Sequence, residues 1–198
     1  MNKSLRFSHK ILLAASLIVL TAFALFTLYN DYLQRNAIRE DLGNYVGEMG
    51  DAASTNIKNL FEGRLLLVQN LAQNIASAPA SAGTLLGQQA LISSFLTVYM
   101  GHINGDFTIR PLTKMPDGYD PRVRPWFKDG LAANGPILTE PYIDASTGKM
   151  VISMIATASR DIGVVGGDMD LDGLVKIINS LNFGGMGYAF LVNEQGKI

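Results

Sequence analysis

Arginine, aromatic and acidic residues gather in one stretch of the sequence and recur at later positions. The stretch reads Tyr119-Asp120-Pro121-Arg122-Val123-Arg124-Pro125-Trp126-Phe127, and it is followed by Tyr142-Ile143-Asp144 and by Asp168. A guanidinium can hold a carboxylate through two parallel hydrogen bonds, and aspartates can hold an ammonium. A zwitterion needs both kinds of partner, so these residues predict a site for a small molecule that carries both charges.

The basic and aromatic residues of this stretch also have a purely structural interpretation. Arg124 could pair with Asp120, and Trp126 could fill the core of the domain. The spacing of these residues does not decide between a structural role and a role in ligand binding, so both interpretations stay open.

The aspartates leave a similar choice. Tyr142 and Asp144 lie two residues apart on a predicted strand, so their side chains point to the same face. Asp144 and Asp168 could bind a ligand, or they could cap a turn and end a strand. Asp170 shares a face with Asp168 and could be either a second ligand-binding group or a cap for the next helix.

A small sheet must bring these residues together, and the sequence predicts its strands from position 95 onward. Asn104-Gly105 is a strong two-residue hairpin signal, and short turns join the later strands. Such short connections predict a largely antiparallel sheet with the helices gathered to one side, which is the α+β class. Short helices are expected at 85–94 and 126–133. The predicted strands cover residues 95–103, 106–110, 137–144, 150–159 and 163–169.

The first thirty residues contain a segment suited to cross a membrane. Residues 11–30 carry no charged side chain and span roughly 30 Å as a helix, which matches the hydrocarbon core of a bilayer. Basic residues precede the segment and Asp31 follows it, so we expect residues 1–10 in the cytoplasm and residues 31 onward in the periplasm. A cleaved secretory signal ending near Ala22-Phe23-Ala24 is the alternative. The apolar residues that continue beyond Ala24 argue against cleavage.

Residues 31–78 are predicted to form a long periplasmic helix. Apolar residues recur there mostly at steps of three and four, which is typical of an amphipathic helix. Gly43, Gly47 and Gly50 mark positions where the helix could break. Its apolar face could pack on a second copy of the chain or on its own downstream domain, and we expect both.

The C-terminal part of the sequence suggests that one structural unit occurs twice. We expect one module at residues 79–171, a connecting helix at 172–182, and the start of a second module at 183–198. The segment YAFLVNEQGK in the last region is similar to VYMGHINGDF in the first module. A single hairpin half cannot bury its own face, so the sequence is expected to be the N-terminal part of a longer protein.

The composition excludes several classes of function. The chain has no cysteine and only two histidines, which excludes disulfides, thiol nucleophiles and a multi-histidine metal site. The net charge is −1 and no basic cluster lies beyond the membrane flank, which argues against a nucleic-acid partner. No motif indicates catalysis or a cofactor, so we expect no enzyme activity and no cofactor.

The order of the binding residues resembles that of a known family. The string D-x-R-x-R-P-W-(Y/F), Y-x-D sixteen residues after the tryptophan, and a later aspartate at a strand end are similar to amino-acid-binding double-Cache sensor domains. The segments FSHKILLAASLIV, LTEPYIDASTGK and VVGGD further resemble the Pct-type amino-acid chemoreceptors, which are methyl-accepting chemotaxis proteins. The resemblance covers essentially all of the chain. It implies two PAS-like modules on a long helix, with the ligand in the membrane-distal one.

The resemblance also implies a role for each matching residue. Arg124 and Trp126 would hold the ligand carboxylate, and Phe127 stands where the motif usually has a tyrosine as a third donor. The side chains that would surround the ligand ammonium are Tyr119, Tyr142, Asp144 and Asp168. Asp120 and Arg122 are interpreted as structural partners. The missing hydroxyl at Phe127 leaves the ligand open between an α-amino acid, γ-aminobutyrate and another amine.

Together these patterns predict the sensing part of a receptor in the bacterial inner membrane. Ligand binding in the periplasm would be signalled across the membrane for chemotaxis, and a homodimer would form through the long helix. An alternative is that the same sensor is coupled to a histidine kinase or a cyclic-dinucleotide synthase. A third hypothesis, an exported hydrolase, lacks any recognisable pair of nucleophile and base.

Overall fold

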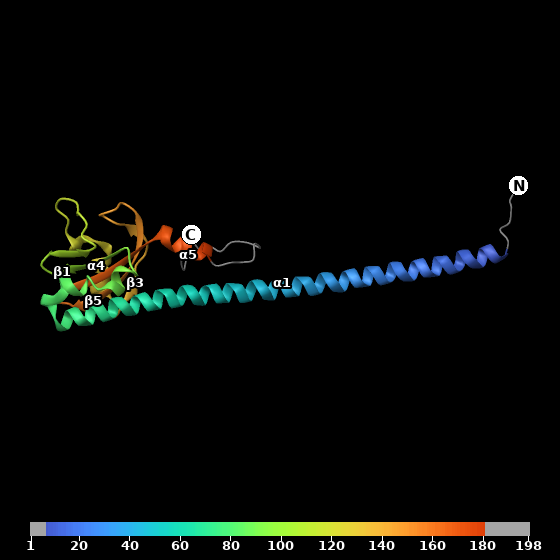
Figure 1. Cartoon of the computed structure of the whole chain (residues 1–198), viewed down its shortest axis with the longest axis horizontal. Helices are drawn as coiled ribbons and strands as arrows, with labels where there is room; N and C mark the ends of the chain where they lie inside the picture. Colours follow the sequence, from blue (N-terminus) through green and yellow to red (C-terminus); the bar gives the residue numbers. More distant parts are fainter. Residues whose placement is uncertain (1–6, 181–198) are drawn as a thin grey trace. The chain divides into compact units, whose positions relative to one another are not determined.

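The computed structural model describes residues 7–180. The chain divides into two compact units between Ala52 and Ala53. Helix α1 (Phe7–Ser77) contributes its N-terminal part to the first unit and its C-terminal part to the second (Figure 1). The start of a second module, predicted at residues 183–198, lies outside the described residues.

The first unit presents the apolar side chains of α1 to its surroundings. An 18-residue window of the helix has a mean hydropathy of 2.6, and none of it is buried by protein. By length and composition this helix can cross a membrane. The helix continues through Gly43, Gly47 and Gly50, so a break at these glycines is not observed. A glycine in a helix interior costs only about 1 kcal/mol relative to alanine, which is too little to break a helix of 71 residues.

The second unit is built on an antiparallel sheet, as predicted for an α+β fold. The strands follow the order β2-β1-β6-β5-β3, and β4 also pairs with β5. Their bounds are β1 (Thr97–His102), β2 (Phe107–Arg110), β3 (Ile137–Leu138), β4 (Tyr142–Ile143), β5 (Met150–Ser159) and β6 (Gly163–Asp170). The predicted hairpin at Asn104-Gly105 joins β1 to β2, and Gly105 has a φ of 96°, which favours glycine.

The strand predicted at residues 137–144 was wrong in one respect. It forms two separate strands of two residues, β3 and β4, divided by Thr139 to Pro141. Proline has no N–H to donate to the neighbouring strand, so the ladder is interrupted there. Because of this interruption, Tyr142 lies on a short strand at the edge of β5.

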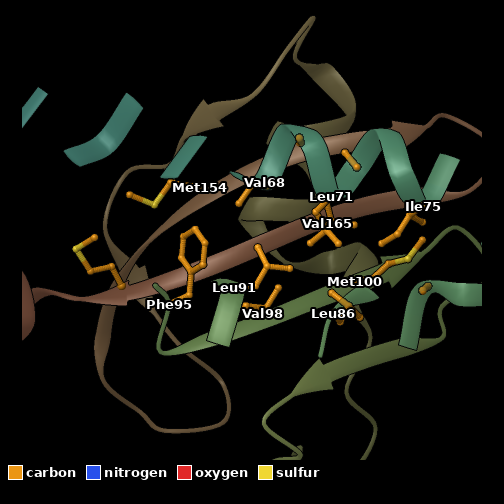
Figure 2. Packing of buried hydrophobic residues seen from close by; sticks show 14 of the residues in the cluster. Val68, Leu71, Ile75, Leu86, Leu91, Phe95, Val98, Met100, Met154 and Val165 are labelled. Carbon is orange, nitrogen blue, oxygen red and sulfur yellow. The ribbon is translucent and has the colours of Figure 1, made fainter. Parts of the chain in front are cut away.

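A hydrophobic core fills the space between α1 and one face of the sheet. Figure 2 shows Val68, Leu71 and Ile75 of α1 among the side chains packed with those of the strands. Val98 and Met100 of β1 are both fully buried in this core. Side chains alternate between the two faces of a strand, so Tyr99, which lies between them, points to the opposite face. That face carries the candidate site.

Short helices complete the unit, and they lie on both faces of the sheet. The helix bounds are η1 (Pro79–Ser81), α2 (Ala82–Leu85), α3 (Gln89–Ile92), η2 (Pro121–Val123), α4 (Pro125–Ala132) and α5 (Leu171–Ser180). Gly130 of α4 lies against Val164, whereas the next residue of β6, Val165, belongs to the core next to α1. The expectation that the helices gather to one side was therefore wrong. The absence of a side chain at Gly130 permits this contact, because a Cβ atom there would lie 2.5 Å from Val164.

Candidate ligand-binding site

A narrow cavity lies on the sheet face opposite α1. Its volume is about 10 Å³. That is room for about one water molecule, so a larger ligand requires the surrounding side chains to move apart. The lining residues are Tyr99, Phe107, Ile109, Met115, Tyr119, Arg124, Trp126, Tyr142, Asp144 and Asp168.

The cavity brings together six of the seven predicted binding residues, which come from three separate stretches of the chain. Tyr119 and Arg124 lie in the loop and turn before α4, and Trp126 lies in the first turn of α4. The other three are Tyr142 on β4, Asp144 just after β4, and Asp168 near the end of β6. The seventh, Phe127, is not among the lining residues.

Asp168 is the most deeply buried acidic residue of the cavity, with 2% of its surface exposed. Its Oδ1 accepts a hydrogen bond of 2.6 Å from the Tyr99 hydroxyl and another from the Ser153 hydroxyl. Its Oδ2 accepts a bond of 3.1 Å from the Thr97 hydroxyl. The described residues thus supply hydroxyl groups, but no basic side chain, within hydrogen-bonding distance of this carboxylate.

Burial dominates the proton affinity of Asp168. It raises the pKa of this carboxyl to about 6, and the hydrogen bonds from Ser153 and Tyr99 act in the opposite direction because they favour the charged form. Burial and the nearby Asp168 also raise the pKa values of Tyr99 and Tyr142, and burial raises the pKa of Tyr119 to about 12. All three tyrosines therefore keep their protons near neutral pH and can donate hydrogen bonds.

Asp144 both caps a turn and lines the cavity. Its Oδ2 accepts bonds from the Ser146 hydroxyl (2.7 Å) and from the backbone N–H and hydroxyl of Thr147 (2.9 and 2.7 Å). Burial raises the pKa of Asp144, but these hydrogen bonds together outweigh it and lower the pKa below the usual value. Asp144 is therefore ionised at neutral pH, and its turn-capping role does not exclude contact with a cation.

The two arginines of the stretch have different surroundings. Arg122 forms a two-pronged pair with Asp120, with its Nη2 2.8 Å from Oδ2 and its Nε 2.9 Å from Oδ1. Arg124 instead donates from Nη2 to the Ile143 carbonyl at 2.7 Å and lies 5.9 Å from the centre of the Tyr142 ring. The structural pairing with Asp120 is thus made by Arg122. Arg124 forms no ion pair with any described residue, and its guanidinium borders the cavity.

Phe127 lies in the core rather than in the cavity. It is 2% exposed, and its ring meets the ring of Trp126 edge-on at 5.6 Å between centroids. Successive residues of a helix point about 100° apart, so Trp126 can face the cavity while Phe127 faces the interior. This arrangement differs from the implied role of Phe127 beside the ligand carboxylate.

Sequence reasoning missed several residues of the site. Four further lining residues are Tyr99, Phe107, Ile109 and Met115. Two others, Thr97 and Ser153, hold Asp168. Ser153 carried a usable signal, because it is the only polar residue in the buried stretch from Val151 to Ala156. A polar residue at such a position usually needs a buried partner.

The glycine pair before Asp168 explains how Tyr99 reaches the carboxylate. Gly166 lies opposite Tyr99 in the β1–β6 register, and an added Cβ would lie 2.7–2.9 Å from the Tyr99 ring. A side chain at position 166 would therefore displace the ring and its hydroxyl. The sequence VVGGD keeps this face of β6 open for Tyr99.

We expect Gly166→Ala to lower the stability by about 1–3 kcal/mol, as overpacking does, and to weaken ligand binding at least tenfold. Thermal unfolding and ligand titration measure the two effects. Gly135→Ala is the control, because a Cβ at this position meets nothing within 4 Å. A Gly166→Ala protein with reduced stability but unchanged affinity would mean that the position of Tyr99 does not matter for binding.

A wider hollow lies between α1 and β5 but offers different chemistry. Its volume is about 360 Å³, and its lining includes Gln69, Gln73, Asn134 and Arg160. Among the described residues, no carboxylate lines it, so these residues offer no anionic partner for an ammonium. Among the residues that the structure describes, no cluster of three or more His, Cys, Asp or Glu side chains could hold a metal ion.

Comparison with known proteins finds close relatives along the whole chain. The methyl-accepting chemotaxis protein McpG of Pseudomonas putida is 74% identical over 198 residues, and PctB of Pseudomonas aeruginosa is 51% identical over 203 residues. The chain spans 32% of the length of each of these relatives. No protein-family model matches the chain.

Solved structures of ligand-binding domains share the fold. The domain of the Pseudomonas fluorescens chemoreceptor CtaA in complex with L-serine is 50% identical, with a TM-score of 0.75; the match covers 80% of this chain and 71% of that domain. The domain of the Pseudomonas aeruginosa chemoreceptor PctC in complex with GABA is 42% identical, with a TM-score of 0.71. That match covers 79% of this chain and 74% of the PctC domain.

Proposed function

Because this chain belongs to the Pct-type amino-acid chemoreceptors, a group of methyl-accepting chemotaxis proteins, we propose that its second unit binds a small amino acid or a related amine. One observation carries the proposal. The guanidinium of Arg124, which has no acidic partner among the described residues, and the buried carboxylate of Asp168 border the same narrow cavity. A ligand with one carboxylate and one ammonium would give each of them its missing partner.

The ligand carboxylate is proposed to lie against Arg124 and Trp126. Trp126 lines the cavity two residues after Arg124 and carries an N–H donor. The ligand ammonium is proposed to lie between Asp144 and Asp168. Tyr119 and Tyr142 would complete its surroundings with hydroxyl groups.

The rest of the cavity wall favours an uncharged ligand tail. Phe107, Ile109 and Met115 supply apolar surface, and within residues 7–180 the only acidic or basic side chains of the lining are those of Arg124, Asp144 and Asp168. The domain of CtaA is described with L-serine, L-alanine and L-valine, and that of PctC with GABA. Both kinds of ligand carry one carboxylate and one ammonium, which match Arg124 and the two aspartates of the cavity. The two kinds differ in how far apart the carboxylate and the ammonium lie within the ligand.

The wider biological role is proposed from the N-terminal unit and the relatives. Residues 11–30 of α1 would cross the inner membrane, with the second unit in the periplasm. Two copies would pair through the exposed apolar side chains of α1 beyond the membrane, such as Ile38, Leu42 and Val46. The relatives favour a chemotaxis output over a histidine kinase or a cyclic-dinucleotide synthase. The role is one of sensing and needs no catalysis.

Calorimetric titration of the full-length receptor in lipid nanodiscs tests the binding function. We expect saturable binding of L-alanine, L-serine or GABA. Propionate, which lacks the ammonium, and ethylamine, which lacks the carboxylate, are the matched controls and should bind at least a hundredfold more weakly than L-alanine, since each leaves one buried charge unpaired. If no zwitterion binds, or if the controls bind as well as L-alanine, the proposal is wrong.

A further inference from the structure

Ser153 of β5 is a fully buried polar residue that contacts three residues of the cavity without lining it. Its exposed fraction is 0%. Its hydroxyl lies 2.7 Å from the Tyr142 hydroxyl and 3.1 Å from that of Tyr99, and it donates to Oδ1 of Asp168. Such a buried cluster is stable only if each polar group has a partner.

The number of protons available fixes the direction of these hydrogen bonds. Each hydroxyl has one proton to donate, and an ionised carboxylate can only accept. Tyr99 and Ser153 therefore give their protons to Asp168, which leaves the Ser153 oxygen free to accept the proton of Tyr142. The direct distance from the Tyr142 hydroxyl to Asp168 is 3.4 Å, which is too long for a strong bond. Tyr142 thus acts on the carboxylate mainly through Ser153.

The backbone around Ser153 holds its hydroxyl in place. Ser153 lies directly opposite Asp168 in the β5–β6 register. Its N–H donates to the Thr139 hydroxyl at 3.0 Å, and its carbonyl accepts from the Thr139 N–H at 2.9 Å. The bonds to Thr139 on one side and the pairing with β6 on the other leave the serine little freedom to move.

We propose that Ser153 is a positioning residue, which links Tyr142 to Asp168 and keeps the carboxylate of Asp168 ionised and fixed in the orientation that receives a ligand ammonium. The inference rests on the proposed function. It assigns Ser153 a role beyond packing, although its side chain does not border the cavity. The alternative is that the serine only fills space, which alanine could do nearly as well.

The test measures the titration of Asp168 without ligand, using the carboxyl carbon chemical shift of the labelled receptor. Burial raises the pKa of Asp168 to about 6, so we expect the titration midpoint of the wild-type carboxyl near that pH. Ser153→Ala should raise this midpoint by about one pH unit, because a donor to the charged form is lost. Tyr142→Phe should raise it by less, and should have no further effect when Ser153 is already alanine.

Binding of L-alanine measured as a function of pH should show the same displacement. The pH below which affinity declines should move upward by about one unit in Ser153→Ala, which means a loss of about fivefold at pH 6, about tenfold at pH 5 and almost none at pH 8. If the melting temperature falls but neither midpoint moves, Ser153 is only a packing residue. If Ser153→Ala does not fold, Tyr142→Phe alone decides, and an unchanged midpoint in that protein overturns the proposal.

The ligand-free titration separates this inference from the proposed function. A receptor that binds no amino acid would refute the proposed function. The Asp168 midpoint would still report whether Ser153 supports the charged carboxylate. An equal effect of Tyr142→Phe with and without Ser153 would refute the link through the serine, even if amino acids bind.

Discussion

Replacing Arg124 by alanine is expected to weaken the binding of L-serine or GABA by about 2–5 kcal/mol, which corresponds to a loss of roughly 30-fold to several thousand-fold. The ligand carboxylate would be withdrawn from water into a cavity that no longer contains a cation. Much of this cost comes from leaving a buried charge unpaired. Calorimetric titration of the variant and of the wild-type receptor measures the difference.

The position of Arg124 before binding adds to its expected effect. Its Nη2 is held by the Ile143 carbonyl at 2.7 Å, and its guanidinium stacks near the Tyr142 ring. A side chain that is already oriented loses less entropy when the ligand arrives. Arg124→Lys should restore only part of the affinity, because an ammonium lacks the planar fork that holds a carboxylate in two bonds.

Arg122→Ala is the matched control, since it removes the same type of side chain two residues away. Arg122 is paired with Asp120 on the surface, and 48% of its side chain is exposed. Exposed pairs of this kind contribute little to stability. We expect the affinity of the Arg122→Ala protein for L-serine or GABA to stay within threefold of the wild type. An Arg124→Ala protein that is folded and binds as tightly as Arg122→Ala would refute the role of Arg124.

The main features of the second unit were predictable because they depend on local sequence signals. The Asn104-Gly105 turn predicted the hairpin of β1 and β2, and the strand predicted at residues 150–159 is β5. The interruption between β3 and β4 was missed, although Pro141 could have indicated it. The position of α4 on the second face of the sheet was not predictable, because it depends on the long-range contact of Gly130 with Val164.

The charged residues of the predicted site could be picked out from the sequence, but the residues that support them could not. Arg124, Asp144 and Asp168 line the cavity, and their role in binding a ligand stays a prediction. Phe127 was placed beside the ligand by analogy with a tyrosine, but the direction of the α4 turn puts its ring in the core. Ser153 and Thr97 were missed because their roles arise only when β1, β5 and β6 are paired.

Asp168→Asn should separate ligand recognition from stability more clearly than any other change. The substitution keeps the size of the side chain and removes the charge that faces the ammonium. We expect the affinity for L-serine or GABA to fall by about 2–5 kcal/mol at pH 8, for the same reason as in Arg124→Ala. The ligand-free protein should not lose stability at that pH.

The raised pKa of Asp168 predicts that the ligand-free Asp168→Asn protein is more stable than the wild type at pH 8. The folded-state pKa of Asp168 is about 6, against 3.8 for an unperturbed aspartate, so the folded protein binds more protons than the unfolded chain between these values. The free energy of unfolding of the ligand-free wild type therefore decreases as the pH rises from about 4 to about 6. Above pH 6 the cost of this buried charge is about 3 kcal/mol. The asparagine side chain in Asp168→Asn cannot ionise, so the variant should lack this decrease and melt at a higher temperature than the wild type at pH 8.

The pH dependence of binding should change in the same variant. In the wild type the ammonium needs an ionised Asp168, so affinity should fall about tenfold per pH unit below pH 6. In Asp168→Asn the affinity should be low and nearly constant across that range. Titrations at pH 5, 6, 7 and 8 measure both profiles. If affinity falls equally steeply with decreasing pH in both proteins, a group other than Asp168 controls the loss of binding in acid.

Asp170→Asn is the matched control, because it neutralises an aspartate two residues further along the chain. Asp170 accepts a 2.9 Å hydrogen bond from the Gly173 N–H at the start of α5 and does not line the cavity. Asparagine caps a helix about as well as aspartate, so both affinity and melting temperature should change little. If Asp168→Asn lowers the ligand-free melting temperature at pH 8 but leaves the affinity for L-serine and GABA within threefold of the wild type, the Asp168 carboxylate serves only as an acceptor for its surrounding hydroxyls. Its assignment as the partner of the ammonium would then be wrong.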